Sequence, residues 1–167
     1  MGTKRVGLAR TQALIENLKR DLNLNGSSVA GMDQKVVTVT GAGSSSTVTL
    51  TAADSGKVYL VNAADGTQTF TLPALTSGFN IEVIVTVASD NDILITAPGD
   101  NMIVSCRNFT ASGAAEVAVT DTCTNLVMNA DTVAVVGTRV RVFCDGTNYV
   151  AIGDSSVQSG TAFWVTS

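Results

Sequence analysis

The 167-residue sequence contains no histidine, and only 14% of its residues are charged. A typical soluble domain has about 25% charged residues, so we expect other subunits to cover much of this surface. The lack of histidine excludes Ser-His-Asp and Cys-His catalysis, histidine metal ligands and histidine-based pH switches. An enzyme built on this chain would need paired carboxylates, a lysine, or a metal held by oxygen ligands.

Cysteine is also scarce. Cys106, Cys123 and Cys144 are widely spaced and form no CxxC motif, which argues against a zinc ribbon or a redox pair. We expect three thiols that behave as small apolar side chains. Neither a membrane helix, which needs about 18 apolar residues, nor a secretory signal is evident. The sequence therefore predicts a protein made in a cytoplasm with no membrane partner.

Charge is divided unevenly along the chain. Residues 1–20 carry five basic side chains and one acidic one, whereas residues 21–167 carry five basic and thirteen acidic ones. A basic arm on an acidic body indicates that the two parts meet different partners. The acidic body argues against nucleic acid as a partner, because nucleic-acid binding requires a positive surface.

Residues 1–24 are the only part with a helical period and are expected to form an N-terminal helical arm. A helix of this length needs a partner, which would be a copy of itself, its own β body or a docking surface. Residues 25–34 are small and polar and predict a linker. The arm residues expected to bind a partner are Lys4, Arg5, Leu8, Arg10, Leu14, Ile15, Leu18 and Leu22.

From Lys35 onward the period changes to two, as in strands with one buried face. Such runs recur every eight to twelve residues, beginning with "KVVTVT", "STVTLT", "KVYLVN" and "QTFTLP", with turn residues between them. This spacing favours an antiparallel all-β fold over residues 35–167, a sandwich or a barrel. The tail of this body holds Phe163 and Trp164, an aromatic anchor on the body itself or on a neighbour.

The segment "TLTAADSGKVYLVNAADGTQTFTLP" contains a Gly56-Lys57 step that suggests a phosphate loop. The motif GxxxxGK[ST] requires a first glycine where Thr51 stands and a hydroxyl where Val58 stands, so it fails at both ends. Asp54-Ser55-Gly56 and Asp65-Gly66 are then expected to be the bends of a three-strand meander.

The other carboxylates offer no better catalytic set. Asp90 and Asp92 directly precede an apolar run and predict a strand entrance rather than a calcium loop. Most remaining aspartates sit beside Gly, Asn, Ser or Ala, where they stabilise turns. We therefore predict no catalytic, cofactor-binding or metal-binding residues, no cofactor, and no enzymatic activity.

The segment "RVRVFCDGTNYVAIG" predicts a hairpin with Asp145-Gly146-Thr147-Asn148 as its tight loop. Arg139 and Arg141 alternate with Val140 and Val142, so the two arginines share one face of the strand. On an acidic body they either pair with acidic neighbours across a subunit boundary or form a plain solvated face. Together with Phe163 and Trp164 they are the candidate subunit contacts.

Three segments resemble structural proteins of tailed bacteriophages. "LTAADSGKVYLVNAADGTQTFTLPAL" and "GTRVRVFCDGTNYVAIGD" are similar to strand–turn segments that recur in virion proteins, and "TKRVGLARTQALIENLKRDLNL" is similar to the N-terminal arm of small cyanophage virion proteins. The resemblance implies a β-sandwich or jelly-roll-like module, trimeric, seated on the virion and without catalytic activity.

These observations lead to the expectation of a capsid decoration or cement protein on the virion surface. Its partners would be the major capsid protein, bound through the arm, and sister subunits in a homotrimer. The alternative is a short tail-fibre or head-fibre module that binds a host surface glycan. That alternative needs exposed aromatic side chains, for which Tyr149, Phe163 and Trp164 are the late candidates.

Overall fold

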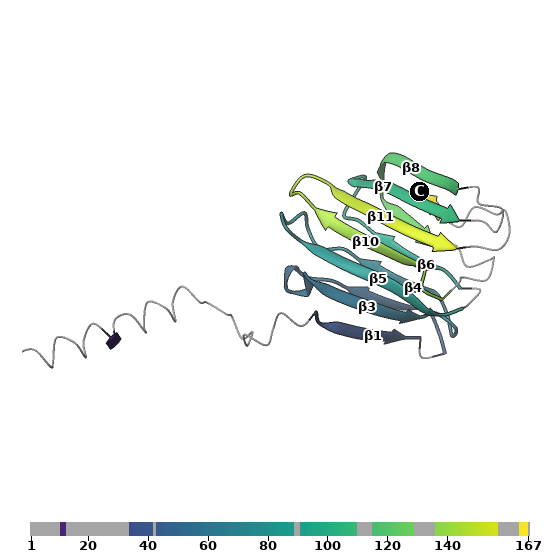
Figure 1. The fold of residues 1–167 in the computed structure, drawn as a ribbon, viewed down its shortest axis with the longest axis horizontal. Coiled ribbons are helices and arrows are strands. Elements are labelled where there is room, and N and C mark those ends of the chain that lie inside the picture. Colours follow the sequence, from purple (N-terminus) through teal and green to yellow (C-terminus); the bar gives the residue numbers. More distant parts are fainter. Residues whose placement is uncertain are drawn as a thin grey trace, which may run out of the picture. The chain divides into compact units, whose positions relative to one another are not determined.

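A computed structural model describes residues 11–12, 34–41, 43–88, 91–109, 115–128, 136–156 and 164–166 (Figure 1). The chain divides into two compact units, residues 1–33 and residues 34–167. Of the expected helical arm, only Thr11 and Gln12 are described, so the arm helix stays a prediction. The second unit is the β body.

The strands of the body lie close to the runs of alternating apolar and polar residues in the sequence. In most described runs one set of alternate positions is buried and the other is more exposed, as in a strand with one covered face. The described strands are β1 (Val36–Thr40), β2 (Ser46–Thr49), β3 (Lys57–Asn62), β4 (Gln68–Thr71), β5 (Asn80–Val87), β6 (Ile93–Thr96), β7 (Met102–Phe109), β8 (Ala115–Cys123), β9 (Asn125–Met128), β10 (Arg139–Cys144), β11 (Tyr149–Ser156) and β12 (Trp164–Thr166).

These strands form two sheets. One has seven strands in the order β1-β3-β5-β10-β11-β7-β8, and Figure 1 shows them side by side. The other has five strands in the order β12-β9-β6-β4-β2. The all-β prediction is confirmed, but the expected antiparallel pairing is wrong for β1 to β6, which run parallel within each sheet. The jelly-roll arrangement is not confirmed.

The reason is that the first six strands alternate between the sheets. β1, β3 and β5 lie in the seven-stranded sheet, and β2, β4 and β6 lie in the other. Each pair β1–β2, β3–β4 and β5–β6 is one coil of the chain, and successive coils stack. Val36 pairs with Val58 and Ser46 with Gln68, so the partner lies 22 residues further on in both sheets (36 to 58 and 46 to 68).

The expected three-strand meander is therefore also wrong. The bends at Asp54-Ser55-Gly56 and Asp65-Gly66 carry the chain from one sheet to the other instead of joining neighbouring strands of one sheet. Apolar and polar residues alternate in the same way whether two strands are joined by a hairpin within one sheet or by a crossing between two sheets, because each strand buries only one face in both cases. The sequence pattern alone did not separate the two.

The core lies between the sheets and is built from rows of equivalent positions. Leu50, Leu72 and Ala97 occupy the same place in successive coils, and each is only 3% exposed. Tyr59 and Phe70 meet edge to face across the sheets, with 5.3 Å between ring centroids. A row of apolar side chains thus runs along the stack, as in solenoid proteins in which each repeat packs on its neighbours.

The remaining strands extend the stack with a different connectivity. β10 pairs antiparallel with both β5 and β11, and the predicted hairpin between β10 and β11 is confirmed. Asp145 forms the loop, where its Oδ1 accepts hydrogen bonds from the amides of Thr147 and Asn148, both at 2.7 Å. Tyr149 is buried, and its hydroxyl donates to the carbonyl of Pro73 at 2.9 Å.

Gly66 is the tightest point of the described crossings. Its φ is +150°, and a Cβ at this position would lie 2.6 Å from backbone atoms of Ser44 and Ser45 in the preceding coil. We predict that Gly66→Ala lowers the free energy of unfolding by about 2–3 kcal/mol, because the crossings must move apart. Denaturant titration measures this change.

Gly43 provides the matched control. Its φ is also positive, at +74°, but a Cβ there meets nothing within 4 Å. Gly43→Ala should therefore cost only the backbone strain, about 1 kcal/mol. Equal losses for the two variants would show that the close stacking of crossings does not constrain Gly66.

Candidate functional site

The outer face of β10 presents Arg139, Arg141 and Phe143 to solvent. Val140 and Val142 of the same strand are fully buried on the inner face. The prediction that both arginines share one face opposite the valines is confirmed. β10 lies between β5 and β11, so these side chains stand in the middle of the seven-stranded sheet.

Both arginines have interactions within the chain. Nη2 of Arg139 lies 3.9 Å from Oδ2 of Asp154 on β11. The guanidinium carbon of Arg141 lies 5.5 Å from the ring centroid of Phe143, and Glu82 stands opposite Arg141 on β5. The Arg139–Asp154 pair is half exposed on both sides and so contributes little to stability. Its exposed donors remain accessible to a partner.

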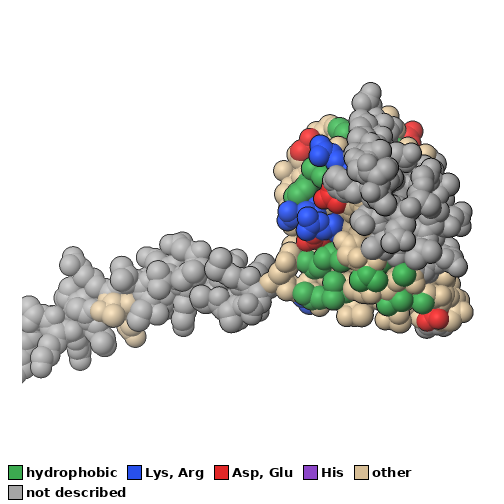
Figure 2. All heavy atoms as spheres, turned by 45° about the vertical axis from the view of Figure 1, so that its right-hand side comes forward, with side chains coloured by type: hydrophobic (Ala, Val, Ile, Leu, Met, Phe, Trp, Pro, Cys, Tyr) green, Lys and Arg blue, Asp and Glu red, His purple; other side chains and the backbone are tan. Residues whose placement is uncertain are grey.

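Ile152 stands beside Arg141 on the same face, whereas Val36 lies three strands away, beyond Glu82 and the buried Val58. Strand register places Val36, Val58, Glu82, Arg141 and Ile152 in one line across β1, β3, β5, β10 and β11, which we call the outer row. Val36 is 56% exposed and Ile152 is 49% exposed. Figure 2 shows hydrophobic side chains beside charged ones on the β body. The combination of exposed apolar groups with arginine is typical of surfaces that contact other proteins.

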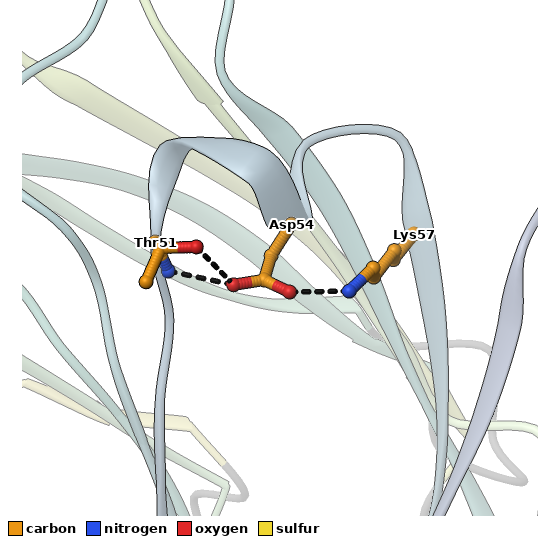
Figure 3. Close-up of polar contacts among 3 residues, drawn as sticks. All are labelled: Thr51, Asp54 and Lys57. Atoms are coloured by element: carbon orange, nitrogen blue, oxygen red, sulfur yellow. Dashed lines mark hydrogen bonds and ion pairs between the residues drawn. The ribbon is translucent and has the colours of Figure 1, made fainter. Parts of the chain in front are cut away.

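The Gly56-Lys57 step is part of a closed turn. In Figure 3, the amide and hydroxyl of Thr51 both donate to Oδ2 of Asp54, each at 2.7 Å. The ammonium of Lys57 pairs with Oδ1 of the same carboxylate. The short 3-10 helix Ala52–Asp54 lies between these partners and leads the chain from β2 into β3. Lys57 therefore neutralises a carboxylate of its own turn.

The carboxyl group of Asp54 is more acidic than an ordinary aspartic acid. Partial burial alone would raise its pKa, but the hydrogen bonds from Lys57 and Thr51 outweigh this and lower the pKa to about 2. The adjoining Ser55 ties the turn to the next coil, because its hydroxyl oxygen accepts a hydrogen bond from the amide of Asn80 at 3.1 Å. The arrangement stabilises a crossing between the sheets.

Other residues singled out from the sequence are placed as follows. Trp164 belongs to β12, which pairs with β9, but its side chain is not described. Asp92 is half-buried just before β6, and its backbone carbonyl accepts a hydrogen bond from the backbone amide of Gln68 at 3.0 Å. The residues that lie outside the described part of the chain are Lys4, Arg5, Leu8, Arg10, Leu14, Ile15, Leu18, Leu22, Asp90 and Phe163.

Two features of the described body were missed in the sequence. The exposure of Phe143 and Ile152 follows from the alternation of "RVRVFC" and "YVAIG", which places both on the arginine face. The second feature is Gln68, whose fully buried amide donates to the carbonyl of Gly66 at 2.8 Å and accepts from the hydroxyl of Ser46. This buried amide joins two successive coils.

The cysteines are buried and free, as the sequence predicted. Burial raises the pKa of the Cys106 thiol to about 12 and also raises that of Cys123. Within the described ranges, no three Cys, Asp or Glu side chains gather as a metal site would require. Over those same residues, no helix has the length and apolar character needed to cross a membrane.

Comparison of the sequence with models of known protein families finds no match, and no curated protein is similar to it. A function for the outer row must therefore follow from its geometry.

The low pKa of Asp54 predicts an acid-sensitive contribution to stability. Its folded pKa of about 2 lies below the ordinary 3.8, so the contribution is complete above about pH 4 and is lost as pH falls toward 2. The free energy of unfolding of wild type should exceed that of Asp54→Asn by about 1 kcal/mol at pH 6, and the difference should vanish near pH 2. Urea titrations at a series of pH values measure it.

Asp65→Asn is the control for this experiment. Asp65 is an exposed aspartate in the next crossing, and Asp65→Asn should not produce the loss of stability at pH 6 that Asp54→Asn produces. If Asp54→Asn loses stability as steeply as wild type when the pH falls toward 2, the ion pair with Lys57 is not the source of the pH dependence.

Proposed function

We propose that this chain is a non-catalytic virion structural protein, a capsid decoration or cement protein of a tailed bacteriophage. The β body would project from the outside of the head, and the basic arm would bind the major capsid protein. A protein that binds the assembled shell but not its free subunits stabilises the shell by mass action. Contact area, rather than a reacting group, would then provide the function.

The observation that carries the proposal is the outer row. It presents Ile152, about half exposed, beside Arg141, which itself lies against Phe143, and a similarly exposed Val36 three strands away. Arginine and aromatic residues are enriched in protein interfaces and account for much of the binding energy there. The row lies across a sheet, and a sheet holds such side chains in a fixed arrangement for a partner.

Sister subunits are the partner that we propose for this face. Arg139 and Arg141 would contact neighbouring copies, joined by Phe163 and Trp164 of the tail, in a homotrimer at a site of local threefold symmetry. Arg139 already lies 3.9 Å from Asp154 of its own chain. The same two charges are available to exchange partners across a subunit boundary, where less solvent would strengthen the pair.

The rival proposal, a fibre module that binds a host surface glycan, has less support. Tyr149, one of its three aromatic candidates, is fully buried and donates its hydroxyl to the carbonyl of Pro73. It cannot stack on a sugar from that position. Phe143 is the exposed aromatic ring of the described body, at 37%, and Arg141 partly occupies its face.

Position in the virion tests the proposal directly. A decoration protein should appear in an icosahedral reconstruction of the virion as density repeated over the outer shell, because each equivalent capsid site binds a copy. The fibre alternative predicts a few copies at the tail or at a single vertex, and binding on a glycan array. Either of these two results would overturn the decoration proposal.

Charge reversal tests the sister-subunit contact. We predict that Arg139→Glu/Arg141→Glu weakens self-association at least tenfold, measured by sedimentation equilibrium. The substitutions replace two positive side chains by negative ones, which repel the acidic body of the neighbouring copy. Both side chains are exposed, so the free energy of unfolding should change by only about 0.5 kcal/mol. Arg139→Lys/Arg141→Lys keeps the positive charge and should weaken self-association less than the glutamate variant does. Unchanged association of the glutamate variant would remove this face from the interface.

A further inference from the structure

Among the described strands, the first coil forms one end of the β body. β1 is the last strand of the seven-stranded sheet at that end, and β2 is the last strand of the five-stranded sheet. The two strands follow each other in the chain and belong to the same coil, so both sheets end side by side. No described strand lies beyond either of them.

Hydrogen bonds show which backbone groups face outward from this end. The carbonyl of Lys35 accepts a hydrogen bond from the amide of Val58 at 3.0 Å. The amide of Gly41 donates a hydrogen bond to the backbone carbonyl of Asn62 at 3.3 Å. Because successive residues of a strand point their backbone groups to opposite sides, the even-numbered residues of β1 point away from β3. Val36, Thr38 and Thr40 therefore direct their backbone groups to the outer edge of β1.

The same alternation applies to β2. The amides of Ser46 and Leu50 donate to the carbonyls of Thr67 and Thr71, at 3.0 and 2.9 Å. Thr47 and Thr49 thus point away from β4, toward the same end. Backbone groups at a strand edge are a template for another strand, because they retain their hydrogen-bonding capacity in a fixed spacing.

The side chains at this end are also incompletely covered. Val37, Val39 and Val48 pack against the core but are only partly buried. Their counterparts in the second coil are Tyr59, Val61 and Phe70, and none of these is more than 3% exposed. A further layer of strands would bury the valines of the first coil to the same degree.

The described edge is short, with five residues in β1 and four in β2, but it lacks the other features of its own strands that keep edges apart in monomeric proteins. Such features are charged side chains, proline and bulges. Residues 36–53 include no charged side chain and no proline. The pairing of β1 with β3 and the pairing of β2 with β4 show no register shift. β8, the edge strand at the other end of the larger sheet, carries Glu116 and Asp121 in its sequence.

We propose that a second copy of this chain pairs with this end across a twofold axis. β1 would run antiparallel to β1 of the partner subunit, so that Thr38 faces its own symmetry mate and Val36 faces the position of Thr40. This register uses every outward-facing residue of β1, and the two seven-stranded sheets become one continuous sheet. β2 and its symmetry mate would lie beside this contact and continue the smaller sheet.

A second copy suits this end better than a charged partner does. The uncharged Val and Thr surface has no charge to repel its own symmetry mate, and it offers no counter-charge to a different protein. The contact is twofold and uses backbone groups at the edge of the sheet, so it differs from the threefold side-chain contact proposed for the outer row, and Val36 belongs to both. It does not depend on where the protein functions.

Thr38→Pro tests the contact in the full chain. Proline removes an amide that points away from β3 and leaves the hydrogen bonds between β1 and β3 in place. We expect the mass measured by light scattering after size exclusion to fall by half relative to wild type. Thr38→Val keeps the amide and the β-branched side chain and should keep the wild-type mass.

A charge pair keeps the test decisive if proline disturbs the strand. Thr38→Lys and Thr38→Glu should each halve the mass, because like charges meet at the twofold axis, and mixing the two proteins should restore it. The proposal is overturned if wild type is monomeric at all concentrations, or if these variants keep its mass. Because no capsid enters the measurement, a failure here is distinct from a failure of the decoration proposal.

Discussion

Parallel hydrogen bonding between strands that lie one coil apart is the interaction on which the rest of the body depends. Val36 pairs with Val58 and Ser46 with Gln68, and the strands of the third coil add to the second in the same direction. This register brings equivalent side chains together, so that Leu50, Leu72 and Ala97 form a buried row. It also fixes which strands end the sheets, because a stack of coils has two ends and each coil contacts only its neighbours.

The polar residues at the crossings follow from this stacking. A crossing exposes backbone groups that no strand partner satisfies, and side chains such as Asp54, Gln68 and Asn91 provide the missing partners. Asn91, for example, donates to the carbonyl of Ala63 in the preceding crossing at 2.8 Å. Residues that suggested ligand chemistry in the sequence are therefore explained by the need to turn the chain between two sheets.

The body then presents two kinds of surface, with different physical characters. The outer row combines exposed apolar side chains with arginine and suits a side-chain contact between subunits. The end formed by β1 and β2 is uncharged and suits backbone pairing. A decoration protein that used both would be held to its neighbours by two different contacts, one sensitive to charge and one to the strand edge.

The sequence by itself determined the strands, the face that each one buries, and the tight loop at Asp145, because strand period and turn chemistry are local properties. It also placed Arg139 and Arg141 together on one face. Only the tertiary structure decided which strands are neighbours. An alternating strand buries one face equally well after a hairpin or after a crossing, and the choice depends on packing between residues far apart in the chain. The similarity of "KVVTVT" and "STVTL" to "KVYLVN" and "QTFTL", 22 residues later (35 to 57 and 46 to 68), is the one sequence signal of the stacked coils. The contact of Arg141 with the Phe143 ring and the closure of Lys57 onto Asp54 required the folded chain, because each depends on how neighbouring side chains fill the same space.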